Sequence, residues 1–119
     1  GYDFVFVDSD ITAGELLGYA CFGPIPLREA AYDLYWIAVA PGRQQQGLGR
    51  RLLLHAEERA AEQGAVEMYI DTSGRAQYVP TRRFYERAGY TTHEVLPDFY
   101  ATGDDKVVYR KHLDRGRAI

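Results

Sequence analysis

The chain has 119 residues, of which 46% are hydrophobic and 26% charged, with a formal net charge of −3. This composition is that of a globular domain and excludes a disordered chain, while the negative charge argues against a general nucleic-acid binder. No apolar run is long enough to cross a bilayer, and no signal-peptide pattern opens the chain. We therefore expect one cytoplasmic domain over residues 1–119, with neither nucleic acid nor membrane as a partner.

The first part of the chain predicts three strands. Residues 2–8 alternate and are rich in β-formers, and residues 18–22 and 32–39 have the same character. Cys21, the only cysteine, lies among apolar neighbours in the second strand, which predicts a buried structural thiol in a reducing compartment. Strands that follow one another without a helix between them favour antiparallel pairing.

At Gly47 the hydrophobic period becomes helical. Leu48, Leu52 and Ala56 share one stripe, and Gly64 is placed to end the helix. A helix that crosses between two strands implies a parallel pair.

The last part of the chain predicts a strand, a short helix and two further strands. The strand covers residues 66–72, a polar loop covers 73–77, and Pro80 stands in the first turn of a helix that ends at Gly89. The final strands, residues 90–95 and 106–109, flank the loop PDFYATGDD. The expected fold class is α/β (α+β), a mixed, mostly antiparallel twisted sheet with flanking helices.

The stretch VAPGRQQQGLGRRLLL, residues 39–54, joins a strand to a helix through two glycines. The N-terminus of a helix has unpaired N–H groups and favours an anion, and glycines allow a phosphate to approach the main chain. Neighbouring side chains add hydrogen-bond donors and positive charge: Arg43, Gln44, Gln45, Gln46, Arg50 and Arg51. The stretch indicates a phosphate or pyrophosphate site, or else a surface turn that needs glycine only for its geometry.

Two other phosphate-binding loops match this stretch less well. A nucleoside-triphosphatase loop needs lysine and a hydroxyl after its last glycine, where Arg50 and Arg51 stand. A dinucleotide fingerprint needs a third glycine at Leu52 and normally opens a βαβ series, although Asp71 lies at a suitable distance for a ribose contact. We therefore reject both motifs for this stretch. A dinucleotide-binding enzyme is kept only as the third hypothesis below.

Three segments resemble the GNAT superfamily of N-acetyltransferases. Gln44-x-x-Gly47-x-Gly49, between IAVAP and GRRLLL, is similar to its acyl-coenzyme A signature. YVPTRRFYERAGY resembles its second segment, with Tyr85 at the tyrosine position and Gly89-Tyr90 as the closing pair. DFYATGDDKVVYRK resembles its last hairpin, whose loop overhangs the acceptor site. Together the segments cover about residues 32–111.

The chain departs from the family pattern at three places. Tyr78 stands where Asn is usual, and Thr81 stands where Ala is usual. The family usually opens with a strand and one or two helices that wall the acceptor side, whereas one strand-like run precedes Gly18. We therefore expect a single N-acetyltransferase domain with a shortened N-terminal part. An exposed acceptor wall would favour a homodimer.

The resemblance implies the acyl-CoA N-acyltransferase fold with acetyl-CoA as donor and no metal. In that fold the strand at residues 35–39 splays from the strand at residues 66–72, and the pantetheine arm lies in the gap. The histidines His55, His93 and His112 lie far apart, which agrees with the absence of a metal. The implied coenzyme-binding residues lie along the first strand, the glycine turn and the second helix: Ile37, Ala38, Val39, Gln44, Gln45, Gln46, Gly47, Leu48, Gly49, Arg50, Tyr78, Thr81, Arg82 and Tyr85. Arg82 or Arg83 would reach the ribose phosphate, or both belong to a solvated helix face.

The implied chemistry is direct attack of a free amine on the thioester. By resemblance Tyr85 is the general acid for the departing thiolate, although a tyrosine beside Phe84 also suits core packing. We favour Asp71 as the base, with Asp33 or an ordered water as alternatives. The final loop carries an acidic and aromatic group that suits a cationic amine or forms a solvated turn: Asp98, Tyr100, Asp104 and Asp105.

The leading hypothesis is an acetyl-CoA-dependent N-acetyltransferase that acts on a primary amine of a small molecule or protein. The alternative is a non-catalytic acyl-CoA-binding or regulatory module of the same fold. A dinucleotide-binding enzyme is the third hypothesis, and it predicts stabilisation by NAD rather than by CoA.

Overall fold

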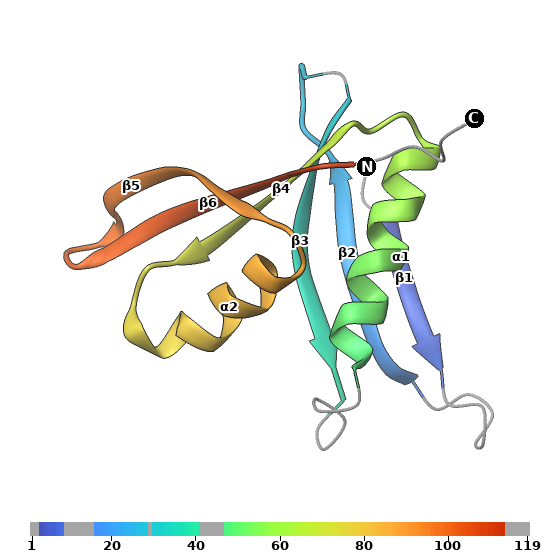
Figure 1. The fold of residues 1–119 in the computed structure, drawn as a ribbon, viewed down its shortest axis with the longest axis horizontal. Coiled ribbons are helices and arrows are strands. Elements are labelled where there is room, and N and C mark those ends of the chain that lie inside the picture. The colour runs from blue at the N-terminus through green and yellow to red at the C-terminus, as the bar shows by residue number, and fades with distance from the viewer. Residues whose placement is uncertain (1–2, 9–15, 29, 41–46, 114–119) are drawn as a thin grey trace.

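The computed structural model describes residues 3–8, 16–28, 30–40 and 47–113. Its described strands form one six-stranded sheet in the order β1-β2-β3-β4-β6-β5 (Figure 1). β3 and β4 pair in parallel, and the other neighbouring pairs are antiparallel. The predicted order of elements and the mixed sheet are confirmed. The elements are β1 (Asp3–Asp8), β2 (Leu16–Pro24), β3 (Ala31–Val39), α1 (Leu48–Glu62), β4 (Glu67–Ser73), the 3₁₀ turn η1 (Ala76–Tyr78), α2 (Val79–Arg87), β5 (Thr91–Ala101) and β6 (Asp104–His112).

The last hairpin is longer than predicted. β5 continues to Ala101, so most of the expected loop PDFYATGDD is strand. Pro97 is tolerated because β5 is an edge strand, and Asp98 adopts a left-handed φ of 53° where the register of the β5–β6 pair shifts. The loop prediction was wrong because Pro, Asp and Gly were all taken as turn signals. The turn itself lies at Gly103, whose φ is 78°.

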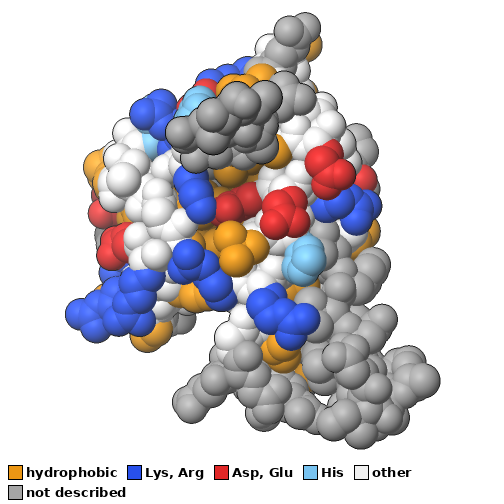
Figure 2. All heavy atoms as spheres, turned by 45° about the vertical axis from the view of Figure 1, so that its right-hand side comes forward, with side chains coloured by type: hydrophobic (Ala, Val, Ile, Leu, Met, Phe, Trp, Pro, Cys, Tyr) orange, Lys and Arg blue, Asp and Glu red, His pale blue; other side chains and the backbone are white. Residues whose placement is uncertain are grey.

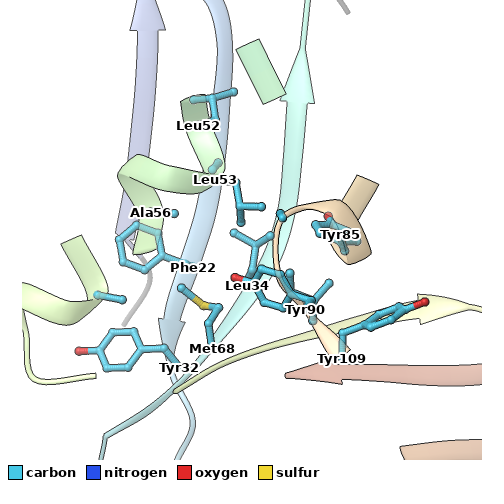
Figure 3. Close-up of a cluster of buried hydrophobic side chains, with 14 of the residues drawn as sticks. Phe22, Tyr32, Leu34, Leu52, Leu53, Ala56, Met68, Tyr85, Tyr90 and Tyr109 are labelled. Carbon is cyan, nitrogen blue, oxygen red and sulfur yellow. The ribbon is translucent and has the colours of Figure 1, made fainter. Parts of the chain in front are cut away.

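The core packs one face of α1 against β2 and β3 and continues to β4, β6 and α2 (Figure 3). Leu52, Leu53 and Ala56 are fully buried, so the predicted helical stripe is confirmed. Gly64 follows the helix with a φ of 104°, a conformation that glycine adopts without strain. Truncating a buried leucine to alanine costs roughly 2–5 kcal/mol, so this stripe fixes the position of α1 and of the turn at its start.

A second part of the core is built from tyrosines that tie α2 to both helical and strand neighbours. The Tyr85 and Tyr90 rings meet edge to face at 6.0 Å between centroids. The Tyr90 hydroxyl donates to the Glu57 carboxylate at 2.7 Å, and Lys111 Nζ donates to the same carboxylate at 2.9 Å. Glu57 is buried in α1, and these two partners satisfy its charge.

The sheet opens between β3 and β4. Their parallel pairing joins Ala31–Leu34 to Glu67–Ile70 and stops there. Beyond that point β3 stays with β2, whereas β4 runs away with β5 and β6, and α2 lies near the angle between the two limbs (Figure 1). The β2–β3 register shifts at the same place, which leaves Tyr35 as a bulge. The predicted splay of the two strands is confirmed.

Cys21 is buried inside the domain, and charges of both signs lie on its surface. Cys21 is 1% exposed, and burial raises the pKa of its thiol, so the predicted buried thiol is confirmed. Acidic and basic side chains are interspersed on the face shown in Figure 2. In the part of the chain that the structure describes, neither helix has the length and apolarity needed to cross a membrane.

Candidate active site

Two glycines lie at the start of α1, and they differ in backbone conformation and surroundings. Gly47 has a φ of 70°, and an added Cβ would meet nothing within 4 Å. The backbone conformation therefore requires this glycine, while the space beside it is open. A Cβ at Gly49 would lie 3.4 Å from the Phe84 ring, an ordinary van der Waals distance, so this position faces α2 and has little space for a larger side chain. The first turn of α1 contains no acidic residue, which leaves its positive end available to an anion.

A cavity of about 650 Å³ lies beside this turn, and we call it the turn cavity. It is bounded by the end of β3, the start of α1 and α2. Its wall includes Ile37, Val39, Gly47, Gly49 and Arg50. Arg50 adds a cation at the mouth of the cavity, where its Nη1 donates to the Arg87 carbonyl at 3.3 Å. Main chain, glycine and a cation together make a site that suits a phosphate-bearing ligand.

A second cavity, of about 540 Å³, lies where β3 and β4 diverge, and we call it the aromatic cavity. Aromatic side chains from β3, η1, α2 and β5 contribute to its wall. Asp71 and Asp104 are the charged residues among the described lining, and Thr72 and Ser73 contribute hydroxyl groups. The aromatic lining residues are Tyr35, Trp36, Tyr78, Tyr85 and Tyr100.

The two cavities share three lining residues, Ile37, Thr81 and Tyr85. A ligand in one cavity and a ligand in the other would therefore meet at these side chains. Tyr85 is 8% exposed, and burial raises the pKa of its hydroxyl to about 12. The hydroxyl is consequently protonated at neutral pH and can donate a proton at the junction.

Asp71 and Asp33 occupy different environments. Asp71 lines the aromatic cavity, and its carboxylate is 3.2 Å from Lys106 Nζ. Asp33 lies with Asp71 in a smaller hollow of about 260 Å³ and is not part of the described lining of the aromatic cavity. Burial raises the pKa of the Asp33 carboxyl, and the neighbouring Asp71 raises it further. Of the two predicted base candidates, Asp71 is the one that lines the aromatic cavity.

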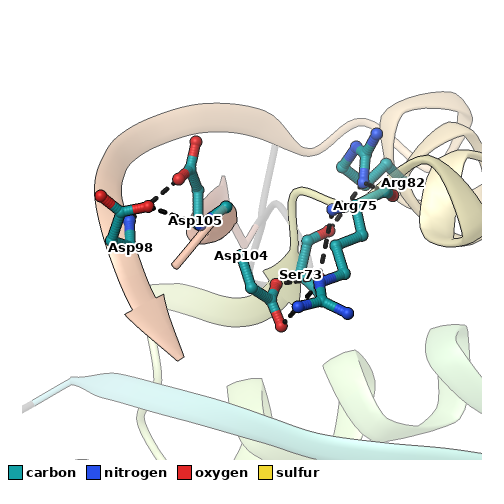
Figure 4. Close-up of polar contacts among 7 residues, drawn as sticks. Ser73, Arg75, Arg82, Asp98, Asp104 and Asp105 are labelled. Atoms are coloured by element: carbon teal, nitrogen blue, oxygen red, sulfur yellow. Dashed lines mark hydrogen bonds and ion pairs between the residues drawn. The ribbon is translucent and has the colours of Figure 1, made fainter. Parts of the chain in front are cut away.

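A polar cluster ties α2 to the ends of β4 and β6 (Figure 4). Arg82 Nη1 donates to the carbonyls of Ser73 and Arg75 at 2.6 and 2.9 Å. Arg75 Nε lies 3.4 Å from the Asp104 carboxylate, which also accepts a hydrogen bond from the Ser73 hydroxyl. Asp104 thus faces the aromatic cavity with its charge already balanced. Arg82, which we expected near the ribose phosphate, contacts main chain beside the aromatic cavity.

The predicted acidic and aromatic group of the last hairpin divides into two pairs. Tyr100 and Asp104 line the aromatic cavity. Asp98 and Asp105 instead stabilise the hairpin: Asp98 N donates to the Asp105 carboxylate at 2.9 Å, and Gly103 N donates to the Asp98 carboxylate at 2.7 Å. These carboxylates stabilise the irregular part of β5 and the turn at Gly103.

The other predicted coenzyme residues are placed as follows. Leu48 is 3% exposed and packs in the core, so its main chain is the part that can face a ligand. Ala38 pairs with Tyr19 of β2, and Tyr78 lines the aromatic cavity. Gln44, Gln45 and Gln46 lie outside the described residues.

Sequence reasoning missed the contribution of Tyr35 and Trp36 to the cavity wall. Both are more than a third exposed, at 38% and 46%, although they stand in a central strand. The adjacent aromatic pair inside a strand was an available signal, because strict alternation would bury one of the two. The bulge at Tyr35 and the loss of β4 as a neighbour together expose both side chains.

Comparisons with known proteins agree with this geometry. Residues 2–90 match the sequence profile described as the acetyltransferase (GNAT) family, whose members use acetyl-CoA. The chain superimposes on a proposed GNAT acetyltransferase from Desulfovibrio desulfuricans with a TM-score of 0.91 and 50% identity, over 96% of this chain and 70% of that one. It shares its fold with an aminoglycoside 6′-N-acetyltransferase solved with coenzyme A, at a TM-score of 0.80 and 20% identity, over 98% of this chain and 76% of that one.

Two curated relatives match part of the chain. The uncharacterised N-acetyltransferase YuaI of Bacillus subtilis is 40% identical over 68 residues, which are 56% of this chain and 39% of the relative. The [ribosomal protein bS18]-alanine N-acetyltransferase of Escherichia coli K12 is 32% identical over 73 residues, which are 61% of this chain and 48% of the relative. The matched region thus spans less than half the length of each curated relative.

Proposed function

The chain belongs to the acetyltransferase (GNAT) family, and on that premise we propose that it transfers an acetyl group from acetyl-CoA directly to a primary amine. The observation that carries this proposal is the meeting of two cavities at Tyr85. One cavity has the features of a phosphate-binding turn, and the other has the aromatic and acidic lining that attracts an amine. We propose a cytoplasmic location for the reaction.

The turn cavity would hold acetyl-CoA. The pyrophosphate would lie at the first-turn amides near Gly47 and Gly49, beside the positive charge of Arg50. The pantetheine arm would run along the β3 edge at Ile37 and Val39, because the pairing of β3 with β4 ends at Leu34. Main-chain hydrogen bonds to an added extended chain are the usual way in which a free strand edge binds such a ligand. This arrangement would bring the thioester to the junction of the two cavities.

The amine would approach from the aromatic cavity. Its nitrogen lone pair attacks the thioester carbonyl carbon, the carbon–sulfur bond breaks, and the products are an amide and the CoA thiol. Tyr85 would donate a proton to the departing sulfur and regain one from solvent, and the surplus proton of the amine would pass to Asp71 or to a water beside it. Holding the two reactants together lowers the entropic part of the barrier, which is worth roughly 7–11 kcal/mol in well-aligned cases.

The acceptor would be an amine of a small molecule or of a protein. The Escherichia coli relative acts on the alanine of a ribosomal protein, and the enzyme solved with coenzyme A acts on aminoglycosides. Both acceptors are amines, and they differ greatly in size and charge.

The proposal is tested by measuring thiol release from acetyl-CoA with and without a panel of primary amines, with mass spectrometry of the acetylated product. We expect amine-dependent release of one thiol for each amide formed. Binding of acetyl-CoA without turnover on any amine would contradict the proposal and favour the non-catalytic acyl-CoA-binding module. Stabilisation by NAD and not by CoA would contradict both and favour a dinucleotide-binding protein.

A further inference from the structure

Half-exposed aromatic rings gather in the aromatic cavity. Nine large hydrophobic side chains of the described residues are exposed, and four of them line this one cavity. They are Tyr35, Trp36, Tyr78 and Tyr100, with exposures of 38%, 46%, 39% and 49%. Scattered exposed hydrophobic residues are ordinary, whereas a concave cluster of rings is typical of a ligand site. At about 540 Å³ the cavity has the size of a small-molecule site.

Most of the negative charge in the aromatic cavity is already paired with cations of the protein. Asp104 is already bound by Arg75 and by the Ser73 hydroxyl. Asp71 has one cation beside it, Lys106 at 3.2 Å, and its side chain is 44% exposed, so it can still receive an ammonium group. Within the described lining of the aromatic cavity, a ligand with several ammonium groups would have to displace Arg75 or Lys106 to find further carboxylate partners. The charges therefore favour an acceptor with a single ammonium group.

The rings favour an acceptor with an aromatic body. Aromatic faces attract ammonium groups and stack against or pack edge to face with other rings. Trp36 and Tyr100 come from β3 and β5, which border the cavity from opposite limbs of the sheet. A ring bound between such walls buries apolar surface that neither a polyamine nor an aminoglycoside can offer.

We propose that the acceptor is a monoamine whose primary amino group is joined to an aromatic ring by a short alkyl chain. This inference rests on the proposed function and names the substrate class of the same site. The ring lies among the cavity aromatics, the ammonium group lies near Asp71, and the chain lets the amine reach the junction at Tyr85. The ammonium group first loses a proton to water, and the free amine attacks the thioester carbon. The carbon–sulfur bond breaks, Asp71 or water takes the second proton of the nitrogen, Tyr85 protonates the sulfur, and the products are the N-acetyl arylalkylamine and the CoA thiol.

The test compares kcat/KM for 2-phenylethylamine and tryptamine with kcat/KM for propylamine, spermidine, kanamycin and a peptide with an N-terminal alanine. We expect the two aromatic monoamines to exceed each of the others by at least about tenfold, because each of the others lacks the ring, the single charge or both. An equal or higher value for the polyamine, the aminoglycoside or the peptide would overturn the proposed class and leave the acetyltransferase function standing. Absence of turnover on every amine would overturn both.

Two substitutions in the cavity wall sharpen the test. Trp36→Ala and Tyr100→Ala are each expected to raise the KM for tryptamine about tenfold, and by a clearly larger factor than the KM for propylamine, which offers no ring to stack. Phe4→Ala is the matched control, because Phe4 is 43% exposed and lies on β1, outside the described cavity lining. Use of two independent positions guards against a variant that fails to fold, which its Tm would reveal. An equal rise in KM for tryptamine and propylamine, or an equal effect of Phe4→Ala, would contradict the role of the rings.

Discussion

The two cavities that meet at Tyr85 are built in different ways. The turn cavity combines the glycine turn between β3 and α1, where main chain can face a ligand, with side chains of α2. The aromatic cavity is made of side chains from β3, β4, η1, α2 and the β5–β6 hairpin. A site of main-chain amides is fixed by local backbone conformation and resists most substitutions, whereas a site of side chains changes with each substitution. The difference suggests that the first holds a fixed ligand and the second determines which acceptor is used.

The largest expected effect concerns the turn. Gly47→Glu forces a side chain into a left-handed conformation and places a negative charge at the proposed phosphate site. We predict that the Kd for acetyl-CoA rises more than about 100-fold in calorimetry.

Gly64→Glu is the matched control for this prediction. Gly64 has a φ of 104°, and an added Cβ would also meet open space there, but it lies at the opposite end of α1. The control should share the backbone strain and keep the wild-type Kd. Equal loss of acetyl-CoA binding in both variants would show that the substitutions act by destabilising the fold. It would then give no support to a phosphate site at the turn.

The second prediction concerns the junction. Tyr85→Phe removes the proposed proton donor and keeps the ring, so kcat should fall roughly 100-fold with little change in either substrate's binding, as is typical for loss of a general acid. Tyr109→Phe is the control, because the Tyr109 hydroxyl donates to Glu86 and Tyr109 is not among the described lining of either cavity. A wild-type kcat for Tyr85→Phe would exclude Tyr85 from the chemistry.

The third prediction concerns the acidic side of the aromatic cavity. Asp71→Asn keeps the shape and removes both the charge proposed to receive the ammonium group and the proposed proton acceptor, so the acceptor KM should rise about tenfold and kcat should fall, while the Kd for acetyl-CoA stays constant. Steady-state kinetics with the preferred amine measures this change. Asp105→Asn is the control, because that carboxylate accepts the Asp98 N–H, which an amide oxygen can still do. A change in acetyl-CoA affinity for Asp71→Asn would show that the two cavities are not independent.

The smallest effect concerns alkaline stability. The Tyr85 hydroxyl has a pKa of about 12 in the folded chain against 10.0 as its ordinary value, so the folded state binds this proton more tightly. Its contribution to stability is complete below pH 10 and is lost as the pH rises towards 12. The Tm of the wild type should therefore fall more steeply between pH 10 and 12 than the Tm of Tyr85→Phe. Parallel curves would contradict the burial of this hydroxyl. The pKa of Tyr109 is also about 12, so this residue contributes to the fall of Tm with pH in both proteins.

Much of the fold and the turn cavity could be predicted from the sequence, because both depend on local patterns. The stripe of Leu48, Leu52 and Ala56 placed α1, and the two glycines placed the turn at its start. The boundaries failed at β5, where Pro97 and Asp98 indicate a loop in isolation. Pairing with β6 along one edge of that strand outweighed those local preferences.

The aromatic cavity could not be predicted in the same way, because its parts meet only in three dimensions. Asp104 and Ser73 are 31 residues apart, and their contact depends on the pairing of β4 with β6. The sequence pattern allows Arg82 to lie on a solvated helix face. In the fold it donates to the carbonyls of Ser73 and Arg75. Asp98 could not be told from Asp104 by sequence, although one holds the hairpin and the other faces the cavity.

The central claim is that the donor and the acceptor occupy adjoining cavities at the same time. It is tested most directly by initial velocities measured while acetyl-CoA and the amine are varied together. We predict intersecting double-reciprocal lines, as direct transfer within a ternary complex requires. Parallel lines, which indicate an acetylated enzyme intermediate, would contradict this account of the two cavities.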